Sequence, residues 1–329
     1  MKKLLLCVMI GMLCIFTLAA GGQGGRAQTS EISIATHFAA DTTEFRAVER
    51  FKDTVERGSG GRLTIATFPG SSLGTEMDNL EQVKTNQVTM SVFGDLLTSQ
   101  LAPEFDPTVV PFIFPSNADV YEMFSGQLGD RIRNAIEERG NQILMGLQKR
   151  GARYLTASRE IRTPADLTGL KLRVPEIPTW VAVWGGLGAL PTPVAFAETY
   201  NALQTRVVDA QENPISNIWV AKFYEVNRYI IMTEHLFGVY KWTINRDYFR
   251  ALPDDLRTLV WDAVQEACAW GDAQVDSRER ELFTELRSVG AVFIDVDKQQ
   301  FINAARPHVE RLAATWDPMA RDFIRRYYR

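Results

Sequence analysis

After residue 30, segments with the pattern of a β-strand alternate with segments of helical periodicity. Residues 31–36 (EISIAT) alternate polar and apolar side chains, and residues 42–60 then place Phe45, Val48 and Phe51 at helical spacing before ending in glycine. The pattern continues with a strand, a helix and another strand, at residues 61–69, around Leu80 and Val83, and at residues 88–94. This repeat predicts an α/β fold with a largely parallel sheet in this part of the chain.

A second set of such segments begins near Asn141. It comprises three strand-like runs and two helical runs, at residues 141–148, 170–175, 228–233, 178–189 and 196–205. Residues 236–245 have strand composition and could return the chain to the first set. We therefore expect two α/β lobes with a central cleft, of the kind that holds small molecules. The expected lobes are residues 28–150 with 239–278, and residues 151–238 with 279–329.

Residues 253–290 have the pattern of one very long helix. Pro253 and two aspartates are typical of a helix start, and Gly290 is typical of a helix end. Two apolar stripes flank the polar run DSRERE at 276–281: Leu256, Leu259, Val260, Ala263, Val264 and Ala267, and then Leu282, Phe283, Leu286 and Val289. A helix with apolar ends and a solvated middle suits a strut across two lobes. The alternative is two ordinary helices broken near Gly271.

The first residues have the layout of a secretory signal peptide. Lys2 and Lys3 precede an apolar run at 4–20, and small residues follow. We expect a signal peptide at 1–27, cleaved after Ala27 or after Ala20, and hence a periplasmic protein. The alternative is an uncleaved anchor, because 17 apolar residues nearly suffice to span a bilayer.

Charge and cysteine content narrow the functional classes. Loss of Lys2, Lys3 and Arg26 with the leader would change the formal net charge from −4 to −7, since −4 − 3 = −7. A mildly acidic chain without a basic tract is a poor nucleic-acid binder, and we expect no such partner. Cys268 would be the sole cysteine of the processed chain, which excludes an internal disulfide.

The motifs of common catalytic sites are missing from the sequence. The three histidines, His37, His235 and His308, are scattered, and there is no HExxH, paired-cysteine zinc pattern, phosphate loop or GxSxG elbow. Residues 58–61 (GSGG) precede a strand and are interpreted as a turn. No pair of carboxylates stands out as a general acid and base. We therefore expect no enzyme activity, metal or cofactor, although a secreted hydrolase remains an alternative.

One short run, LKLRVPEIPTW at 170–180, poses a physical problem. Arg173 stands between leucine and valine in a strand-like segment, and burying a guanidinium is costly unless it meets an anion. Arg153 occupies a similar place in KRGARYLTAS at 149–158. Two guanidiniums converging on a cleft would bind a carboxylate with planar, bidentate geometry. Asn213, held extended before a proline, would supply both a donor and an acceptor.

These runs, in this order and spacing, resemble the solute-binding proteins of tripartite ATP-independent periplasmic (TRAP) transporters, the DctP/SiaP-like family. The resemblance covers essentially the whole processed chain, and its most specific segments are SSLGTEMDNLEQV at 71–83, LPTPVAFAETYNALQTRVVDAQENP at 190–214 and KFYEVNRYI at 222–230. It implies the two-lobed periplasmic-binding-protein fold with a long helix spanning both lobes. Arg206 and Ala210 depart from the family pattern, which usually has glycines there.

The resemblance also implies a binding site. Arg173 matches the arginine that pairs with the substrate carboxylate, and Arg153 matches a second cationic contact. Asn213 matches the asparagine that hydrogen-bonds the same carboxylate, and Phe196 matches an aromatic residue that packs on the ligand. Four further residues fall near the site by position: His37 and Glu76 where the first lobe closes, and Glu176 and Trp180 beside the arginine run.

The expected function is to capture a small organic acid and deliver it to a membrane permease with small and large subunits. A monomer without a cofactor is expected. Because Glu176 would repel a second carboxylate but accept hydrogen bonds from hydroxyls, a hydroxylated monocarboxylate such as a sugar acid is favoured. A C4-dicarboxylate, an aromatic acid resting on Trp180, and a ligand-sensing role for a receptor partner are the alternatives.

Overall fold

The computed structural model describes residues 30–327. The predicted signal peptide lies outside these residues. The strands are β1 Ser30–Ala35, β2 Leu63–Phe68, β3 Met90–Phe93, β4 Gln142–Ala157, β5 Lys171–Val174, β6 Leu190–Pro193, β7 Ala210–Pro214, β8 Tyr229–Asn245 and β9 Val292–Ile294. The longer helices are α1 Thr43–Gly58, α2 Glu76–Lys84, α4 Asn117–Ser125, α5 Gln127–Gly140, α6 Pro178–Gly186, α11 Asp254–Ser288 and α12 Lys298–Ala313. The shorter ones are α3 Leu96–Leu101, α7 Thr199–Gln204, α8 Ile215–Val220, α9 Phe223–Val226, α10 Arg246–Ala251 and α13 Pro318–Ile324, with 3-10 turns η1 Pro107–Val109, η2 Pro164–Leu167 and η3 Phe196–Glu198.

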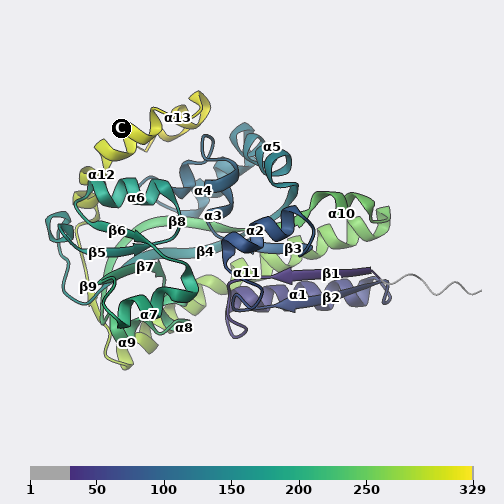
Figure 1. The fold of residues 1–329 in the computed structure, drawn as a ribbon, viewed down its shortest axis with the longest axis horizontal. Helices are drawn as coiled ribbons and strands as arrows, with labels where there is room; N and C mark the ends of the chain where they lie inside the picture. Colours follow the sequence, from purple (N-terminus) through teal and green to yellow (C-terminus); the bar gives the residue numbers. More distant parts are fainter. Residues whose placement is uncertain (1–29, 328–329) are drawn as a thin grey trace, which may run out of the picture.

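Across the described residues the strands form one mixed sheet in the order β2-β1-β3-β8-β4-β7-β5-β6, with β9 also paired to β8. Helices cover both faces of this sheet, with α2 to α5 on one side and α1 on the other near β1 to β3 (Figure 1). The expected parallel pairing holds for β1 with β2 and β3, and for β5 with β6 and β7. Strand β4 runs antiparallel to β7 and β8, and β8 runs antiparallel to β3 and β4 but parallel to β9, so the sheet is mixed.

Two long strands join the lobes. β4 and β8, of 16 and 17 residues, pair with each other from Gln142 with Asn245 to Ala157 with Tyr229. One half of β8 pairs with β3 in the first lobe and its other half pairs with β9 in the second. The prediction of separate strands at 228–233 and 236–245 is therefore wrong, because the chain continues as β8 through an irregular stretch around Glu234 (φ 41°).

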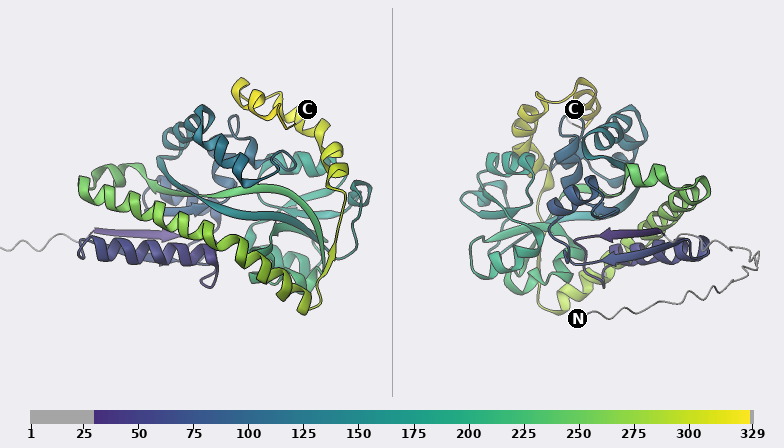
Figure 2. Two further views of the ribbon diagram at one scale, coloured as in Figure 1. Left: turned by 180° about the vertical axis from the view of Figure 1, so that it is seen from behind. Right: turned by 45° about the vertical axis from the view of Figure 1, so that its right-hand side comes forward.

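Helix α11 is a single helix of 35 residues and is not broken at Gly271. It runs diagonally across the back of the molecule, along both lobes (Figure 2). Leu256, Val260 and Val264 pack in the core of the first lobe with α1, whereas Leu282 and Leu286 pack in the core of the second. The predicted strut with two apolar ends is confirmed.

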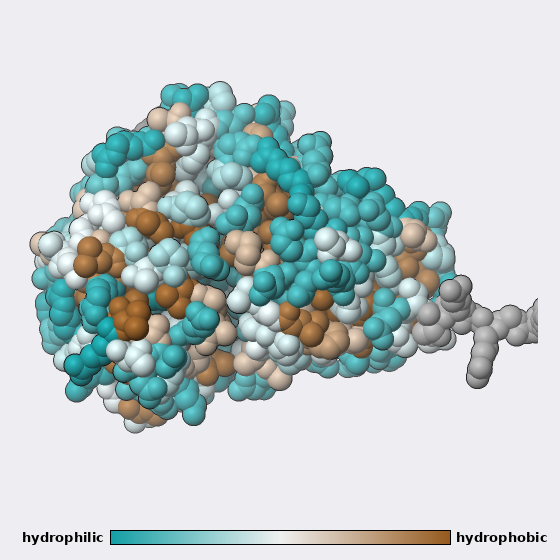
Figure 3. All heavy atoms as spheres, viewed as in Figure 1, coloured by the Kyte–Doolittle hydropathy of each residue, from teal (hydrophilic) through white to brown (hydrophobic). Residues whose placement is uncertain are grey.

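The C-terminal segment returns towards the first lobe. α12 packs against α6, and the start of α13 lies against α5, where Asp317 Oδ2 accepts from Arg131 Nη1 at 3.0 Å. The face shown in Figure 3 is mainly hydrophilic, with hydrophobic residues in small separate groups. In the described part of the chain, no helix is both long and apolar enough to cross a membrane.

Candidate functional site between the lobes

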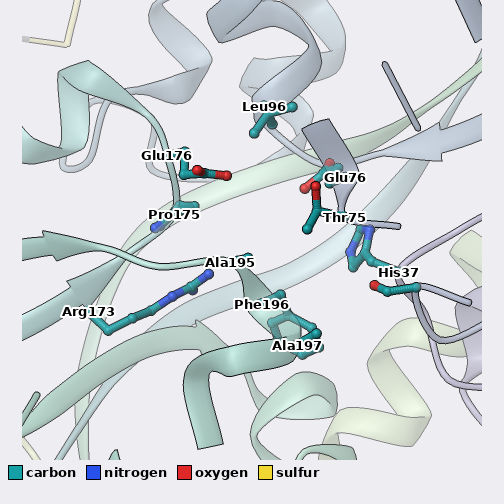
Figure 4. A pocket seen from close by; sticks show the side chains of 11 residues that line it. His37, Thr75, Glu76, Leu96, Arg173, Pro175, Glu176, Ala195, Phe196 and Ala197 are labelled. Carbon is teal, nitrogen blue, oxygen red and sulfur yellow. The ribbon is translucent and has the colours of Figure 1, made fainter. Parts of the chain in front are cut away.

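A cavity lies between the two lobes, and we call it the interlobe cavity. The first lobe contributes side chains from the loops after β1 and β2 and from the starts of α2 and α3, namely His37, Ser71, Thr75, Glu76 and Leu96. The second lobe contributes the end of β5 and the η3 turn, namely Arg173, Pro175, Glu176, Ala195, Phe196 and Ala197. Figure 4 shows Arg173 pointing in from one side, with His37, Thr75 and Glu76 on the opposite side. An adjoining space extends the cavity to Asp95, Arg153, Trp180, Asn213 and Asn217.

Arg173 is the buried cation of this cavity that has no ion pair. Its side chain is 2% exposed, and its Nε donates to the carbonyl oxygen of Val194 at 2.8 Å. Of the three arginines buried within residues 30–327, Arg150 and Arg153 each have a carboxylate within 4 Å and Arg173 has none. Burial lowers the pKa of Arg173 to about 10, so the guanidinium stays charged at neutral pH. A buried charge without a counter-ion is costly, which is expected of a residue that meets an anion from outside.

Arg153 is already paired inside the protein. Its Nε donates to Glu212 Oε2 at 2.5 Å and its Nη2 donates to Glu212 Oε1 at 2.7 Å. Its guanidinium lies over the ring of Trp180, 4.8 Å from the centroid. The same Glu212 carboxylate lies 2.9 Å from His235 Nε2. Arg153 therefore forms part of the cavity wall, with its charge balanced by Glu212.

Arg150 is balanced in the same way by Asp95. Its Nη2 donates to Asp95 Oδ2 at 2.5 Å, and Lys241 Nζ donates to the other oxygen at 3.2 Å. Burial alone would raise the pKa of Asp95, but the charges of Arg150 and Lys241 lower it to about 2. This trio lies beside the cavity and fixes the start of α3.

Asn213 has its side chain committed to neighbours. Its Oδ1 accepts from Arg153 Nη2 at 3.0 Å and from Asn217 Nδ2 at 3.2 Å, and its Nδ2 donates to Gln211 Oε1 at 2.6 Å. As predicted, it is extended before Pro214, in β7. Both the oxygen and the nitrogen of the Asn213 amide therefore have partners, which fixes its orientation in this wall of the cavity.

His37 and Phe196 meet across the boundary between the lobes. Their rings are edge to face, 5.9 Å between centroids. The Nδ1 atom of His37 is buried and has no hydrogen-bond partner in the protein. Burial, together with the nearby arginines, lowers the pKa of His37, so the ring is neutral at pH 7. A ligand would supply the missing partner of this nitrogen.

Two carboxylates face Arg173 from either lobe. Glu76 is the first residue of α2, and its Oε1 accepts from the backbone N–H of Gly94 at 2.6 Å, which fixes its position. Glu176 follows β5 and Pro175 and is exposed at the cavity rim. Thr75 is the N-cap of α2, so its hydroxyl also lies at this wall. The cavity thus combines one unpaired cation with hydrogen-bond acceptors.

The structure brings together all eight residues predicted for the site. Five line the interlobe cavity, and the adjoining space adds Arg153, Trp180 and Asn213. Trp180 is fully buried, and its Nε1 donates to the carbonyl oxygen of Val109. Its ring face is covered by Arg153, which is unfavourable for an aromatic acid resting there. Direct contact of each residue with a ligand stays a prediction.

Sequence reasoning missed the two carboxylates that neutralise the neighbouring arginines, Glu212 and Asp95. A signal for Glu212 was available, because it directly precedes Asn213 in the run QENP. The two departures from the family pattern are both tolerated. Arg206 is exposed and has a left-handed backbone (φ 59°), which is the conformation that favours glycine, and Ala210 is buried in β7.

Comparison with known proteins gives the family. The profile of the DctP family, described as bacterial extracellular solute-binding protein, family 7, matches residues 34–315. The chain belongs to this family. It is a TRAP solute-binding protein with the two-lobed fold of that class, and the family is one of substrate binding. In residues 30–327, no group of three or more His, Cys, Asp or Glu side chains could hold a metal ion.

Three relatives illustrate the likeness of this TRAP solute-binding protein. The 2,3-diketo-L-gulonate-binding periplasmic protein YiaO of Escherichia coli is 30% identical over 281 residues, which is 85% of each chain. A TRAP solute-binding protein of Roseobacter denitrificans with bound L-galactonate is 31% identical, with a TM-score of 0.85 over 91% of this chain and 98% of that one. A Sulfitobacter protein with bound β-D-galacturonate is 26% identical, with a TM-score of 0.85 over 91% and 99%.

Proposed function

We propose that this solute-binding protein captures a hydroxylated monocarboxylate of the sugar-acid class and that Arg173 binds its carboxylate. The observation that carries the proposal is the burial of Arg173 at the cavity wall without a counter-ion, while Arg150 and Arg153 are paired. A ligand carboxylate would neutralise this charge with charge-assisted hydrogen bonds. In the ligand-free protein, the charge of Arg173 would then have no counter-ion within ion-pair distance.

The rest of the cavity is better suited to bind ligand hydroxyl groups than a second ligand carboxylate. Glu76 lies across the space from Arg173, and Glu176 lies at the rim on the Arg173 side; both would accept hydrogen bonds from hydroxyls. A second ligand carboxylate beside them would be repelled, because like charges at short range are unfavourable. The ligands named for the three relatives, L-galactonate, β-D-galacturonate and 2,3-diketo-L-gulonate, are monocarboxylates rich in oxygen.

Binding would close the two lobes around the acid. Contacts between the lobes, such as His37 with Phe196 and Ser216 Oγ donating to Glu44 Oε1 at 3.3 Å, form only when the lobes are close. A ligand drives closure only by binding the closed form more tightly than the open one. The motion would be a hinge within β4 and β8, with α11 flexing. The closed protein, a periplasmic monomer, would deliver the acid to a permease of small and large subunits.

The experiment is a calorimetric and thermal-shift screen of residues 28–329 with L-galactonate, D-galacturonate, 2,3-diketo-L-gulonate and succinate. Ligand at 100 times its Kd adds roughly 2.7 kcal/mol of apparent stability. Arg173→Met is expected to lower affinity for the best acid at least about 30-fold, since truncating a buried charge pair costs about 2–5 kcal/mol. Arg162→Ala, an exposed arginine paired with Glu160, is the control and should bind normally.

The outcomes separate the candidates. Binding of one or more sugar acids, lost in Arg173→Met and kept in Arg162→Ala, is the expected result. Succinate bound as tightly as galacturonate would remove the argument from Glu76 and Glu176 and favour a C4-dicarboxylate. An Arg173→Met variant that folds and binds unchanged would show that Arg173 has a structural role instead.

A further inference from the structure

A second space opens directly beside the interlobe cavity, towards α1 and α8. It is lined mainly by Phe38, Ala39, Phe196, Ala197, Val220 and Ala221, and we call it the apolar annex. It measures about 590 Å³, its open mouth included. Both lobes contribute to it, the first through the loop after β1 and the second through η3 and α8. Four residues line both spaces, His37, Ser71, Phe196 and Ala197, so the annex continues the binding site.

Thr42 and Asn217, two of the four polar side chains that border the annex, have hydrogen-bond partners in the protein. Thr42 Oγ1 donates to the carbonyl oxygen of Ala39 at 2.8 Å and accepts from the backbone N–H of Phe45 at 3.1 Å. Asn217 Nδ2 donates to Asn213, away from the annex. A hydroxyl group placed among Phe38, Val220 and their neighbours would lose hydrogen bonds to water, whereas an apolar group would be stabilised there.

The boundary between the two spaces has a distinctive chemistry. His37 and Phe196 stand edge to face at this boundary, and the buried Nδ1 of His37 has no partner in the protein. A ligand oxygen or hydroxyl at this point would complete the hydrogen bonding of His37. The site thus presents, in order, a cation, hydrogen-bond acceptors, a single imidazole nitrogen and an apolar wall.

We propose that the annex takes an apolar substituent of the acid that Arg173 holds. The ligand class is then a hydroxylated carboxylic acid that carries an alkyl, acyl or aryl group, with a polar atom at the junction beside His37. This inference rests on the proposed function, because it places the carboxylate on Arg173. The ligand would then be recognised through its apolar group as well as its carboxylate, and an unsubstituted sugar acid lacks that apolar group.

Two pairs of probes test the inference, and the members of each pair differ in the apolar group. The first pair is β-D-galacturonate and its phenyl β-glycoside, and the second is lactate and 2-hydroxyhexanoate. In each pair the member with the apolar group is expected to bind at least threefold more tightly, since each buried methylene contributes about fourfold. Val220→Asn and Ala39→Phe, which alter the annex but not the interlobe cavity, should abolish this gain and leave the affinities for galacturonate and lactate within twofold.

Val207→Asn replaces an exposed valine outside both spaces and should keep the gain. The annex proposal would be overturned if phenyl galacturonide and 2-hydroxyhexanoate bound tenfold more weakly than galacturonate and lactate. The proposed function would be unaffected by that result. A gain that persists in both annex variants would also overturn the annex proposal, because the apolar group would then lie elsewhere. If no acid of the earlier panel or of these pairs binds, the proposed function fails, and the annex proposal fails with it.

Discussion

Arg153 and Glu212 form an ion pair inside the protein, with Arg153 Nε 2.5 Å from Glu212 Oε2 and both side chains almost fully buried. The pair lies against the interlobe cavity, so the protein neutralises one arginine there with its own carboxylate. Arg173, on the neighbouring wall, has no carboxylate within 4 Å among the described residues, although the charge of Glu212 partly opposes the lowering of its pKa by burial. The two arginines therefore have different roles: Glu212 neutralises Arg153 within the cavity wall, and Arg173 is proposed to bind the ligand.

Glu212→Gln should destabilise the protein strongly. The substitution leaves the buried guanidinium of Arg153 without its counter-ion, and breaking a buried pair in this way costs about 3–5 kcal/mol. Urea denaturation followed by fluorescence measures the change. Glu160→Gln removes the carboxylate of an exposed pair with Arg162 and should change stability by less than about 1 kcal/mol. Equal effects of the two substitutions would mean that the buried pair contributes little.

Unlike Glu212→Gln, Arg173→Met should not destabilise the protein in the absence of ligand. Because the guanidinium is buried without an ion pair, replacing it with an apolar side chain of similar length is expected to leave the free energy of unfolding within about 1 kcal/mol or raise it. The same variant should lose acid binding. Unfolding of the ligand-free proteins in urea measures this, and a loss of several kcal/mol would show that Arg173 holds the fold together.

Glu279 should make stability depend on pH. Burial, with Asp276 nearby, raises the pKa of Glu279 from 4.5 to about 7 in the folded protein. Between these values the unfolded chain has released a proton that the folded protein retains, so stability falls as pH rises from about 4.5 to about 7. Glu279→Gln should remove this loss, which we expect to be roughly 2 kcal/mol after solvent screening.

The measurement for Glu279 is the difference between the stability curves of the variant and the wild type over pH 4–8. The difference is needed because His37 and His235 act in the other direction. Burial lowers the pKa of both, so the unfolded state takes up protons first as the pH falls, and they make stability increase with rising pH.

Cys268 should be unreactive while the protein is folded. Its side chain is 5% exposed, where α11 packs against β4, and burial raises the pKa of the thiol well above its ordinary value. Reaction of residues 28–329 with Ellman's reagent is expected to be at least 100-fold slower in buffer than in urea. Ser277→Cys places a thiol at an exposed position of α11 and should react rapidly without urea. Rapid native reaction of Cys268 would mean that α11 separates readily from β4.

The strands and the long helix could be predicted because their periodicity is local. Val260 and Leu286 belong to apolar stripes that the sequence displays directly, and both pack where the stripes predict. The continuity of β8 could not be predicted in this way. Thr233, Glu234 and His235 interrupt its apolar pattern. The strand is seen to continue only from its pairing with β4, which is distant in the sequence.

The site shows the same limit. Arg173 could be proposed from its sequence because an arginine in an apolar strand is anomalous by itself. The partner of Arg153 could not, because Glu212 is 59 residues away and meets it only through the register of β4 against β7. Electrostatic balance is a property of the assembled sheet, so sequence reasoning found Arg153 and Arg173 but missed Arg150 and the carboxylates that neutralise Arg150 and Arg153.

The passage of β8 between β3 and β4 also determines how much of the chain must be present before the protein can fold. A growing chain that ends before Tyr229 contains β1 to β3 and β4 but lacks the strand that joins them. Neither lobe is complete without the chain as far as Asn245, about three quarters of the way along the 329 residues. A chain that ends before β8 would therefore lack the pairing that completes each lobe, so the two halves of the site depend on the same strand.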